Sequence, residues 1–374
     1  MKICLDISPA ISHPAGIGRY VFELCNSLLQ IDQQNKYIVF HNQRKNTALQ
    51  APFDKLDKIS VSMHSKLWRS LVLFSQLSNH SQDKIFRDTA LFHATDHLLP
   101  NITNAKSIFT LHDITYILFP GSHTFFNKLF LKAMIPTFLR KSDAIITPSE
   151  ITKKDAINFY AINPDKIYVI PHGVSPNFHR IAPVIIHEIT RKYHLPDRYL
   201  LYVGTIEPRK NLSLIFKALK SIKASGFKTK LVLVGKLGWY YRQVFRHILE
   251  LDLEKDISIL GYVPEEDLPA IYSGADVFAY PTHYEGFGLP VLEAMACSIP
   301  VVCSNIPSLR EVANKAVLMV NPLDPEELTE AIIYLLSNSE LKTDLQEKGL
   351  ERSKQFTWQN CAYKTLQVYQ SVME

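Results

Sequence analysis

The chain has 374 residues, of which 47% are hydrophobic and 21% are charged. This composition is typical of a folded globular protein and excludes the disordered and collagen-like classes. The net charge of +5 is unevenly spread, because residues 1–196 carry +8 and the remainder −3. A basic first half indicates either anionic partners, such as phosphates, nucleic acid or acidic lipid, or simply a soluble basic surface.

The cysteines and the N-terminus bear on the compartment. The five cysteines form no C-x-x-C pair and most lie in apolar runs, so we expect reduced core residues of a cytoplasmic protein. The opening MKICLDISPA has neither the long apolar core nor the cleavage site of a signal peptide. No run of about 18 uncharged apolar residues occurs, so we expect no spanning helix.

The first half of the chain alternates short apolar runs with helical patterns. A glycine turn, Ala15 to Arg19 with Gly16 and Gly18, follows the first run and opens a helical pattern over Tyr20–Leu29. Such alternation is typical of a parallel, doubly wound sheet. The strands predicted here are Ile3–Ile7, Tyr37–Phe40, Ala90–His93, Ser107–Leu111, Ala144–Thr147 and Ile167–Ile170.

Two stretches of the first half, Ser65–Leu77 and Phe125–Lys141, mix aromatic residues, leucine and basic residues. Helices of this composition either lie in an anionic membrane interface or pack on the sheet as ordinary helices. Pro136 lies inside the second stretch and argues against one continuous helix there.

A polar stretch punctuated by Pro171, Pro176, Pro183 and Pro196 indicates a linker between two domains. A second series of apolar runs then begins, most of them followed by helical periodicity. The predicted fold class is therefore α/β, with two consecutive Rossmann-like domains. The strands predicted in the second series are Tyr199–Gly204, Lys230–Gly235, Ile257–Leu260, Val277–Tyr280, Pro300–Ser304 and Val317–Val320.

The strongest motif is YPTHYEGFGLPVLEAMAC, Tyr280–Cys297. A predicted strand ends at its first residue, a glycine loop follows, and Pro290 suits the first turn of a helix over Val291–Cys297. Free N–H groups at such a helix start favour phosphate or sugar oxygens, and glycines permit close approach of a ligand. Glu285 and Glu293 either hold hydroxyls at two ends of one ligand or are ordinary surface glutamates.

A second motif, VGTIEPRKNL over Val203–Leu212, follows a predicted strand and opens a helix. Its adjacent cations, Arg209 and Lys210, can neutralise a diphosphate leaving group without a metal ion. The alternative is a capped helix with solvated charges. The chain contains no D-x-D triplet of the kind that bridges a divalent cation to phosphates, which agrees with a metal-free site.

A third motif, TLHDITY over Thr110–Tyr116, places His112 just after a predicted strand. Ligands bind at the carboxyl ends of strands in open α/β sheets, so His112 is a candidate site residue. The alternative is a buried, hydrogen-bonded histidine. Asp113 either orients this loop or contacts an acceptor.

The E-x7-E spacing of Glu285 and Glu293 inside EGFGLPVLEAMA resembles the signature of retaining glycosyltransferase family 4. That family has the GT-B fold, in which two Rossmann-like domains face each other across a cleft. The resemblance implies an acceptor-binding domain over residues 1–178, a donor-binding domain over 179–356, and a helix over 357–374 that packs back on the first domain. Further matching segments are VGTIEPRKNL, LHDITY, IPHGV (Ile170–Val174), Gly261–Thr282 and SNIPSLREV (Ser304–Val312).

The resemblance also implies roles for single residues. Glu293 would bind the donor ribose, Glu285 the donor sugar ring, and His112 would lie beside the transferred sugar. Arg209 and Lys210 would hold the diphosphate; many relatives have an arginine at the position of Thr205, so Arg209 is expected to supply the guanidinium. The donor-binding residues implied are Gly16, Gly18, Thr205, Tyr262, Gly286, Phe287, Gly288, Leu289 and Glu293.

The function implied is hexosyl transfer from a nucleoside diphosphate sugar to a hydroxyl of a glycan or lipid-linked acceptor, with no metal or other cofactor. The segments LHDITY and GTIEPRKN resemble mannosyltransferases that build surface polysaccharides from GDP-mannose, while UDP- and dTDP-sugars stay open. We expect a cytoplasmic protein, with peripheral contact to the anionic inner face of the plasma membrane as an open alternative.

Three rival functions fit parts of the sequence. A sugar-nucleotide epimerase shares the two-domain fold and would turn over donor with no acceptor present. A nicotinamide oxidoreductase would need a third glycine where this chain has Val21. A nucleic-acid-binding protein could use the basic first half, but no binding motif accompanies it.

Overall fold

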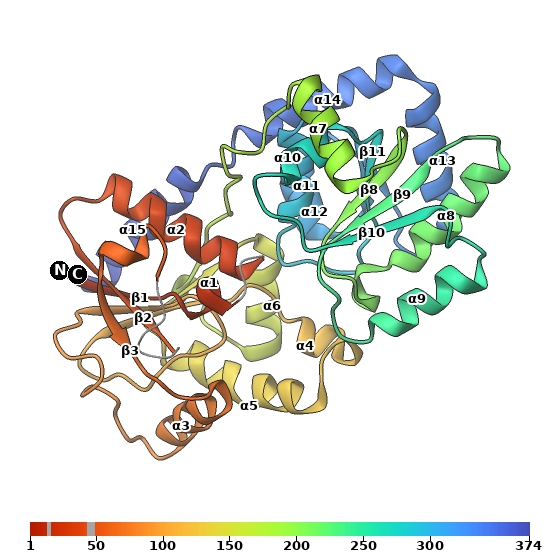
Figure 1. Ribbon diagram of the computed structural model, residues 1–374. Coiled ribbons are helices and arrows are strands. Elements are labelled where there is room, and N and C mark those ends of the chain that lie inside the picture. The colour runs from red at the N-terminus through yellow and green to blue at the C-terminus, as the bar shows by residue number, and fades with distance from the viewer. Residues whose placement is uncertain (13–15, 43–48) are drawn as a thin grey trace. The chain divides into compact units, whose positions relative to one another are not determined.

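A computed structural model describes residues 1–12, 16–42 and 49–374 of the chain. The contacts within it divide the chain into two compact units (Figure 1). Unit 1 comprises Met1–Ile117, Phe125–Gly173 and Thr357–Glu374, and unit 2 comprises Leu118–Thr124 and Val174–Phe356. The chain therefore returns to unit 1 for its last 18 residues, and a short segment before α5 belongs to unit 2.

Unit 1 is built on a seven-stranded parallel sheet in the order β3-β2-β1-β4-β5-β6-β7. Most of its strands are buried along their length, which explains why they read as continuous apolar runs. The edge strand β3 is half exposed and carries Asp57 and Lys58, and the sequence did not predict it. The strands are β1 (Lys2–Asp6), β2 (Lys36–His41), β3 (Asp57–Ser60), β4 (Leu91–Ala94), β5 (Lys106–Thr110), β6 (Ala144–Thr147) and β7 (Ile167–Val169).

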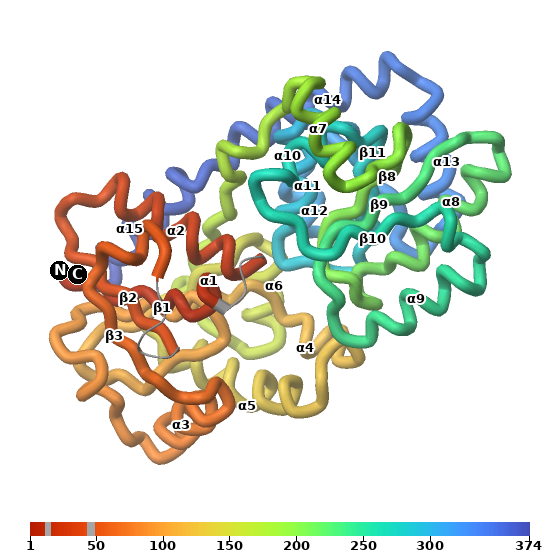
Figure 2. Tube along the Cα trace, in the orientation of Figure 1, coloured from red at the N-terminus to blue at the C-terminus, as the bar shows by residue number. Residues whose placement is uncertain are grey.

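The last helix, α15 (Trp358–Met373), packs against α2 (Ile17–Ile31) and buries Trp358 and Tyr369 in unit 1. Figure 2 shows this blue C-terminal segment running beside the red N-terminal elements. The other helices and 3-10 turns of unit 1 are α1 (Ser8–Ser12), η1 (Phe53–Lys55), α3 (Ser65–Leu77), α4 (Thr115–Leu118, which ends at the border with unit 2), α5 (Phe125–Lys141), α6 (Glu150–Tyr160) and η3 (Pro164–Lys166).

The prediction that Pro136 interrupts its helix is wrong, because α5 runs continuously through it. A proline inside a helix frees the carbonyl four residues earlier, which here belongs to the exposed Lys132 and can be solvated. Buried side chains on both sides of the proline, Ile135 and Phe138, hold the helix on the sheet.

Unit 2 has a six-stranded parallel sheet in the order β10-β9-β8-β11-β12-β13. Its strands are β8 (Tyr199–Val203), β9 (Lys230–Val234), β10 (Ile257–Gly261), β11 (Val277–Tyr280), β12 (Val301–Ser304) and β13 (Leu318–Val320). Its helices and 3-10 turns are η2 (Pro120–Ser122), α7 (Pro183–Tyr193), η4 (Pro208–Lys210), α8 (Leu212–Ala224), α9 (Tyr241–Glu250), α10 (Leu268–Ser273), α11 (Leu289–Ala296), α12 (Pro307–Ala313), α13 (Pro325–Ser337) and α14 (Ser339–Ser353).

The predicted linker contains a helix, α7, which begins at Pro183. Proline suits the first helical turn, where its missing N–H has no intrahelical partner to lose. The border between the units also lies earlier than residue 178, because Val174 already donates its N–H to the carbonyl of Phe356, 3.0 Å away, within unit 2.

Both sheets are doubly wound, and the direction of strand addition reverses between β1 and β4 in unit 1 and between β8 and β11 in unit 2. Loops that leave the carboxyl ends of such a strand pair diverge and leave room for a ligand. The register that joins the second pair is Leu200 to Val277 and Leu201 to Phe278. The motifs after β8 and β11 therefore meet at one edge of the unit 2 sheet.

The structure also bears on the cysteines and on the expected lack of a membrane-spanning helix. All five cysteines are buried and unpaired. Among the residues that the structure describes, no helix combines the length and the apolar content needed to cross a bilayer.

Candidate functional site

The candidate site in unit 2 begins where β8 and β11 end. The short turn η4 follows β8 and carries Arg209 and Lys210, and a glycine loop with Glu285 follows β11. Asn211 joins the two loops, because its side-chain amide donates to the carbonyls of Pro281 (2.9 Å) and Pro322 (2.7 Å). This crosslink fixes the two cationic residues relative to the loop that bears Glu285.

Arg209 is held by three hydrogen bonds to the neighbouring loops. One nitrogen, Nη1, donates to the carbonyl of Tyr284 (2.6 Å) and to Glu285 Oε1 (3.3 Å), and Nη2 donates to Glu207 Oε1 (2.8 Å). Its guanidinium is thus pre-oriented between two carboxylates rather than solvated.

Lys210 is buried, and its ammonium lies 2.5 Å from Glu285 Oε1 and 2.9 Å from the hydroxyl of Tyr280. Burial lowers the pKa of Lys210, while the attraction of Glu285 opposes that shift. Burial raises the pKa of Glu285, but Lys210 and Arg209 outweigh it, so that the net shift of this carboxyl is downward. The attraction between the ammonium and the carboxylate therefore opposes the effect of burial on both groups.

The bonds that Glu285 accepts from Arg209 and Lys210 both end on the same oxygen, Oε1. Besides the two cations, Thr282 Oγ1 (2.9 Å) and the hydroxyl of Tyr280 (3.1 Å) donate to Oε1. Among the described parts of the chain, no residue donates to Oε2. The carboxylate is thus fixed in direction through one of its two oxygens.

The glycine loop leads into α11 through Gly288, whose φ of 114° favours glycine. A Cβ at this position would lie 2.4 Å from Leu309 Cδ2, the end of a side chain that can move, so the dihedral rather than the space requires glycine. Pro290 lies in the first turn, as predicted. Gly286 and Leu289 flank the turn, whereas the side chain of Phe287 is buried against Phe356 and can offer a ligand only its backbone.

Glu293 lies in α11 and is buried, with 3% of its surface exposed. The hydroxyl of Tyr272 on α10 donates to its Oε2 at 2.9 Å. Of the two glutamates of the motif, Glu285 is thus bonded to the cations and Glu293 to a tyrosine from another helix.

Two predicted donor residues lie at exposed positions of unit 2. Thr205 follows β8 and is exposed, and its carbonyl accepts a hydrogen bond from Tyr202 at 3.1 Å. Tyr262 follows β10 and is half exposed, with the ammonium of Lys236 5.0 Å from its ring centroid.

His112 in unit 1 follows β5 and is buried. Its Nε2 lies 2.8 Å from the carbonyl of Thr95, to which it must donate, and the ring meets Tyr20 edge-on at 4.9 Å. Burial lowers its pKa, so that the ring is neutral at physiological pH and Nδ1 is an acceptor. Asp113 caps its own turn, because its Oδ1 accepts from the backbone N–H (2.9 Å) and hydroxyl (2.6 Å) of Thr115.

The first glycine turn is partly described. Gly16 has a φ of 59° and precedes α2, and Gly18 is buried in the first turn of that helix. The carbonyl of Gly16 accepts the N–H of Tyr20 at 3.1 Å. Ala15, the first residue of the predicted turn, lies outside the described residues.

Four polar residues of the site were not singled out from the sequence: Glu207, Tyr272, Tyr280 and Thr282. Three of them stand inside or beside the quoted motifs, and Tyr272 stands within the matching segment Gly261–Thr282. Their residue types gave no sign that Glu207 would bond Arg209 or that the other three would bond Glu285 or Glu293. Ligands bind where the strand order of such a sheet reverses, so polar residues in the loops after those strands are candidates for the site. This rule would have found Glu207 and Thr282.

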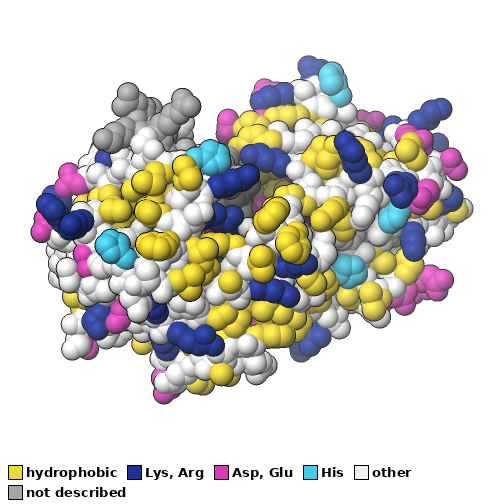
Figure 3. All heavy atoms as spheres, turned by 90° about the horizontal axis from the view of Figure 1, so that it is seen from below, with side chains coloured by type: hydrophobic (Ala, Val, Ile, Leu, Met, Phe, Trp, Pro, Cys, Tyr) yellow, Lys and Arg dark blue, Asp and Glu magenta, His cyan; other side chains and the backbone are white. Residues whose placement is uncertain are grey.

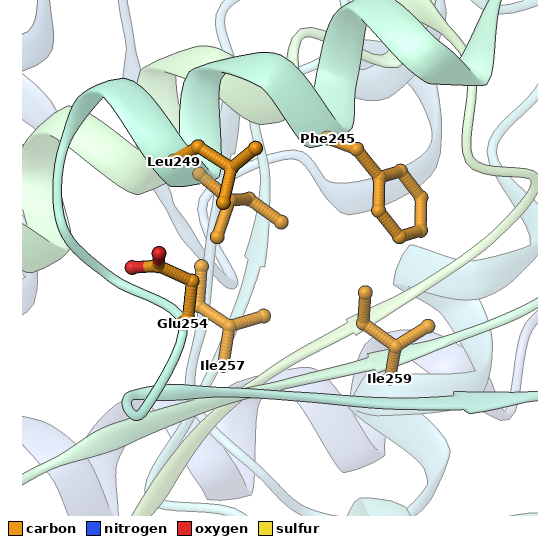
Figure 4. Close-up of a pocket in the computed structure, with 6 residues that line it drawn as sticks. Phe245, Leu249, Glu254, Ile257 and Ile259 are labelled. Atoms are coloured by element: carbon orange, nitrogen blue, oxygen red, sulfur yellow. The ribbon is translucent and has the colours of Figure 1, made fainter.

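An apolar pocket of about 230 Å³ lies beneath α9 in unit 2 (Figure 4). Five of its six lining residues are apolar, and Glu254 is the sixth; the close-up shows its carboxylate turned away from the isoleucines. None of the predicted site residues lines it. Among the described ranges, no group of three or more His, Cys, Asp or Glu residues is arranged to hold a metal ion.

Comparison with known proteins covers both halves of the chain. Residues 14–178 match a family model described as Glycosyltransferase Family 4, and residues 187–352 match one described as Glycosyl transferases group 1. O-antigen chain mannosyltransferase B of Escherichia coli is 31% identical, over 99% of each chain. O-antigen chain mannosyltransferase RfbU of Salmonella typhimurium is 28% identical, over 66% of this chain and 65% of its own.

Solved structures of glycosyltransferases have the same two-unit α/β fold as this chain. Sucrose-phosphate synthase of Thermosynechococcus elongatus superposes with a TM-score of 0.77 at 21% identity, over 100% of this chain and 99% of its own. Anabaena HepE, solved in complex with UDP and glucose, gives a TM-score of 0.77 at 18% identity, over 99% of this chain and all of its own.

Proposed function

The chain belongs to glycosyltransferase family 4, and from that premise we propose that it transfers a mannosyl group from GDP-mannose to a hydroxyl of a glycan or lipid-linked acceptor, with retention at the anomeric carbon. Glycosyl transfer itself is the activity of the family and of the full-length relative named above. The mannosyl group, the guanine base of the donor and the retention at the anomeric carbon are our proposal.

One observation carries the proposal: two buried cations converge on Glu285 where β8 and β11 end. Buried charges are costly unless they are paired, so a chain that keeps Arg209 and Lys210 out of water has a use for them. A diphosphate is the anion that matches two adjacent cations. Because the cations supply the counter-charge, we propose that no metal ion is needed, which agrees with the lack of a D-x-D triplet.

We assign the following roles in unit 2. Arg209 and Lys210 bind the diphosphate, together with backbone N–H groups of the turn Gly286–Leu289. Glu285 accepts a hydroxyl of the donor sugar through Oε2, since its Oε1 is occupied. Glu293 binds the ribose. Thr205 and Tyr262 line the phosphate and base positions.

In unit 1, we assign to the backbone of Gly16 and Gly18 a contact with the diphosphate. His112 contacts the transferred sugar, for which its neutral ring offers Nδ1 as an acceptor. These assignments follow the family resemblance of GIGR and LHDITY and the positions of these segments after β1 and β5.

The step breaks the bond between the anomeric carbon and the diphosphate oxygen and forms the bond between that carbon and the acceptor oxygen. The acceptor proton passes to an oxygen of the departing phosphate. Charge grows on the diphosphate in the transition state, so Arg209 and Lys210 act where preorganised charge lowers the barrier most. We assign the role of covalent nucleophile to none of the described residues.

A second candidate donor is a UDP-sugar, which the UDP complex of Anabaena HepE favours. The mannosyltransferase names of the relatives favour mannose, which supports GDP-mannose instead. A dTDP-sugar is the remaining alternative.

Thermal unfolding with GDP, UDP and dTDP tests the choice of base. A ligand that binds only the folded state raises the apparent stability by RT ln(1 + [L]/Kd), so we expect GDP to raise Tm more than the other two. Nucleotide release from GDP-mannose with and without a glycan acceptor then tests the reaction, and proton NMR of the product reports the anomer. A larger shift with UDP, or release that needs no acceptor, would replace this proposal with a UDP-sugar transferase or an epimerase.

A further inference from the structure

Helix α3 in unit 1 has apolar side chains on two faces. Its inner face is buried through Trp68 and Val72, and Trp68 lies 5.5 Å from the ring of Phe40 in the core. Its outer face exposes Leu67, Leu71, Phe74 and Leu77, which recur at intervals of three and four residues. A helix that packs on a globular core normally turns a polar face outward, so the outer face of α3 lacks the residues expected toward water.

Helix α5 repeats this feature at its first turns. Phe125, Phe126 and Leu129 are exposed, Phe126 with 81% of its surface. The rest of the helix is anchored from Leu131 onward by buried side chains. Seven large apolar side chains are thus exposed on two helices, far more than the isolated apolar residues that are normal on a protein surface.

The two helices form one surface. Arg69 of α3 donates to Asn127 Oδ1 of α5 at 3.0 Å, and its guanidinium lies 4.6 Å from the ring centroid of Phe130. At the other end, the ammonium of Lys141 donates to the carbonyl of Gln76 and to Asn79 Oδ1, each 3.2 Å away. Their starts and their ends are therefore tied together, and the exposed apolar residues of both helices belong to one face.

The charged residues of the two helices have one sign. The two helices contain six basic residues and no Asp or Glu: Lys66, Arg69, Lys128, Lys132, Arg140 and Lys141. Figure 3 views the molecule from the side on which α3 and α5 lie in Figure 1, and it shows hydrophobic side chains there interspersed with Lys and Arg.

We propose that this face of α3 and α5 binds an anionic lipid surface, with its exposed Phe and Leu side chains in the interface and its lysines against the headgroups. Apolar side chains flanked by lysine and arginine suit the headgroup boundary of an acidic bilayer. A protein partner fits less well, because the buried parts of protein interfaces are depleted in lysine and this face carries four. The inference concerns a surface apart from the donor residues and stands whichever sugar nucleotide is used.

Co-sedimentation of the full chain with vesicles tests the proposal. One set of vesicles contains phosphatidylcholine alone, and the other contains phosphatidylglycerol as well. We expect at least about tenfold tighter binding to the anionic set, because each basic residue near such a surface adds about 1 kcal/mol. Binding should weaken as salt rises, since the headgroup attraction is screened.

Two pairs of variants separate the apolar and the basic contributions. The double variant Phe74→Ser, Phe126→Ser should lower affinity for anionic vesicles at least about tenfold, because two exposed aromatic side chains lose their burial in lipid. Its matched control is Leu323→Ser, Tyr363→Ser, which changes side chains 75% and 58% exposed elsewhere. Lys66→Glu, Lys132→Glu should abolish the preference for anionic lipid, whereas Lys154→Glu on α6 should keep it.

The results also separate this proposal from the proposed reaction. The variants should release nucleotide with a water-soluble acceptor at the wild-type rate, since none of these residues belongs to the donor site. Equal binding of wild type to neutral and anionic vesicles, or an unchanged affinity of the serine variant, would overturn the proposal. A different outcome would show that the face joins two copies of the chain. In that case the wild type would not bind vesicles, and sedimentation velocity would show a wild-type dimer that the serine variant does not form.

Discussion

At the scale of single residues, the charges around Glu285 balance without a ligand. Arg209 and Lys210 face Glu207 and Glu285, so two buried cations meet two carboxylates. A donor diphosphate would add negative charge to this group. The two cations would then be attracted to the phosphates as well as to Glu285. Each cation is thus paired with a carboxylate, and the proposed diphosphate would find both cations already fixed in position.

Replacing Lys210 with alanine should lower kcat by about 10²-fold or more, because the ammonium stabilises charge that develops only as the diphosphate leaves. Lys217→Ala, which removes an exposed lysine of α8, is the matched control and should turn over normally. Steady-state kinetics with saturating donor measures the effect.

The alanine variant also leaves Glu285 without its closest cation, so folding must be checked separately. Lys210→Arg keeps the charge and should retain more activity than the alanine variant. If both variants have a Tm close to that of the wild type, the loss of activity comes from the catalytic step and not from unfolding. Wild-type turnover in a folded Lys210→Ala variant would remove the lysine from the mechanism.

At the scale of elements, α15 is joined to the sheet of unit 1 by a buried histidine. His93 on β4 lies with Nδ1 2.7 Å from the hydroxyl of Tyr369 on α15 and with Nε2 2.7 Å from Thr110 Oγ1 on β5. Burial lowers the pKa of His93 to about 3. The last helix is thus attached through a group that is neutral in the folded chain.

This attachment predicts a pH dependence. A histidine whose pKa is lowered by folding binds a proton more readily when unfolded, so its contribution to stability is complete above about pH 6.5 and is lost as pH falls toward 3. Relative to His93→Gln, the wild type should lose roughly 2–3 kcal/mol of unfolding free energy between about pH 6.5 and 4.5.

The comparison with a variant is needed because other groups titrate in the same range. Burial raises the pKa of Asp6 to about 7, so this carboxyl acts in the opposite sense and destabilises the fold as pH rises. Urea unfolding followed by the fluorescence of Trp68 and Trp358, both buried in unit 1, measures the difference. Parallel pH profiles for wild type and His93→Gln would contradict the prediction.

The start of α15 also depends on one glycine. A Cβ on Gly173 would lie 2.2 Å from the backbone nitrogen of Trp358 and 2.5 Å from the carbonyl carbon of Thr357, and neither atom can move without shifting the helix. We expect Gly173→Ala to lower the unfolding free energy by roughly 2–4 kcal/mol.

Gly121→Ala is the matched control, since a Cβ there meets no atom within 4 Å. Thermal melts of the two variants should differ by several degrees, with Gly121→Ala close to the wild type. Equal melting temperatures would show that the end of unit 1 tolerates a displaced helix.

At the scale of the whole molecule, two doubly wound sheets each present a strand pair where the order reverses, and motifs of the sequence follow those strands. Segments from both ends of the chain build unit 1, so this unit is discontinuous in sequence. The two cations and Glu285 of the proposed donor site all belong to unit 2, within one continuous stretch.

A donor site neutralised by side chains predicts that the enzyme works without divalent cations. Treatment with excess EDTA should leave kcat unchanged within about twofold, and added Mg²⁺ or Mn²⁺ should not raise it. Nucleotide release after dialysis against EDTA measures this directly. A loss of activity that Mn²⁺ restores would show that a metal, rather than Lys210 and Arg209 alone, neutralises the diphosphate.

The local order of the chain follows from the sequence because strands that are buried on both faces must be continuously apolar. This rule found the runs that became β1, β8 and β11, and proline and glycine marked the start of α11. The same rule missed β3, which lies at an edge and is polar, and it treated the stretch that contains α7 as linker.

The tertiary structure alone decided which side chains meet. The sequence places Glu285 and Lys210 75 residues apart, and only the pairing of β8 with β11 brings them to 2.5 Å. The sequence also gave no sign that the hydroxyl of Tyr272 would bond Glu293, or that residues 118–124 would belong to unit 2. Periodicity reports how each segment faces the core, whereas contacts between distant segments depend on strand order, which a local pattern does not encode.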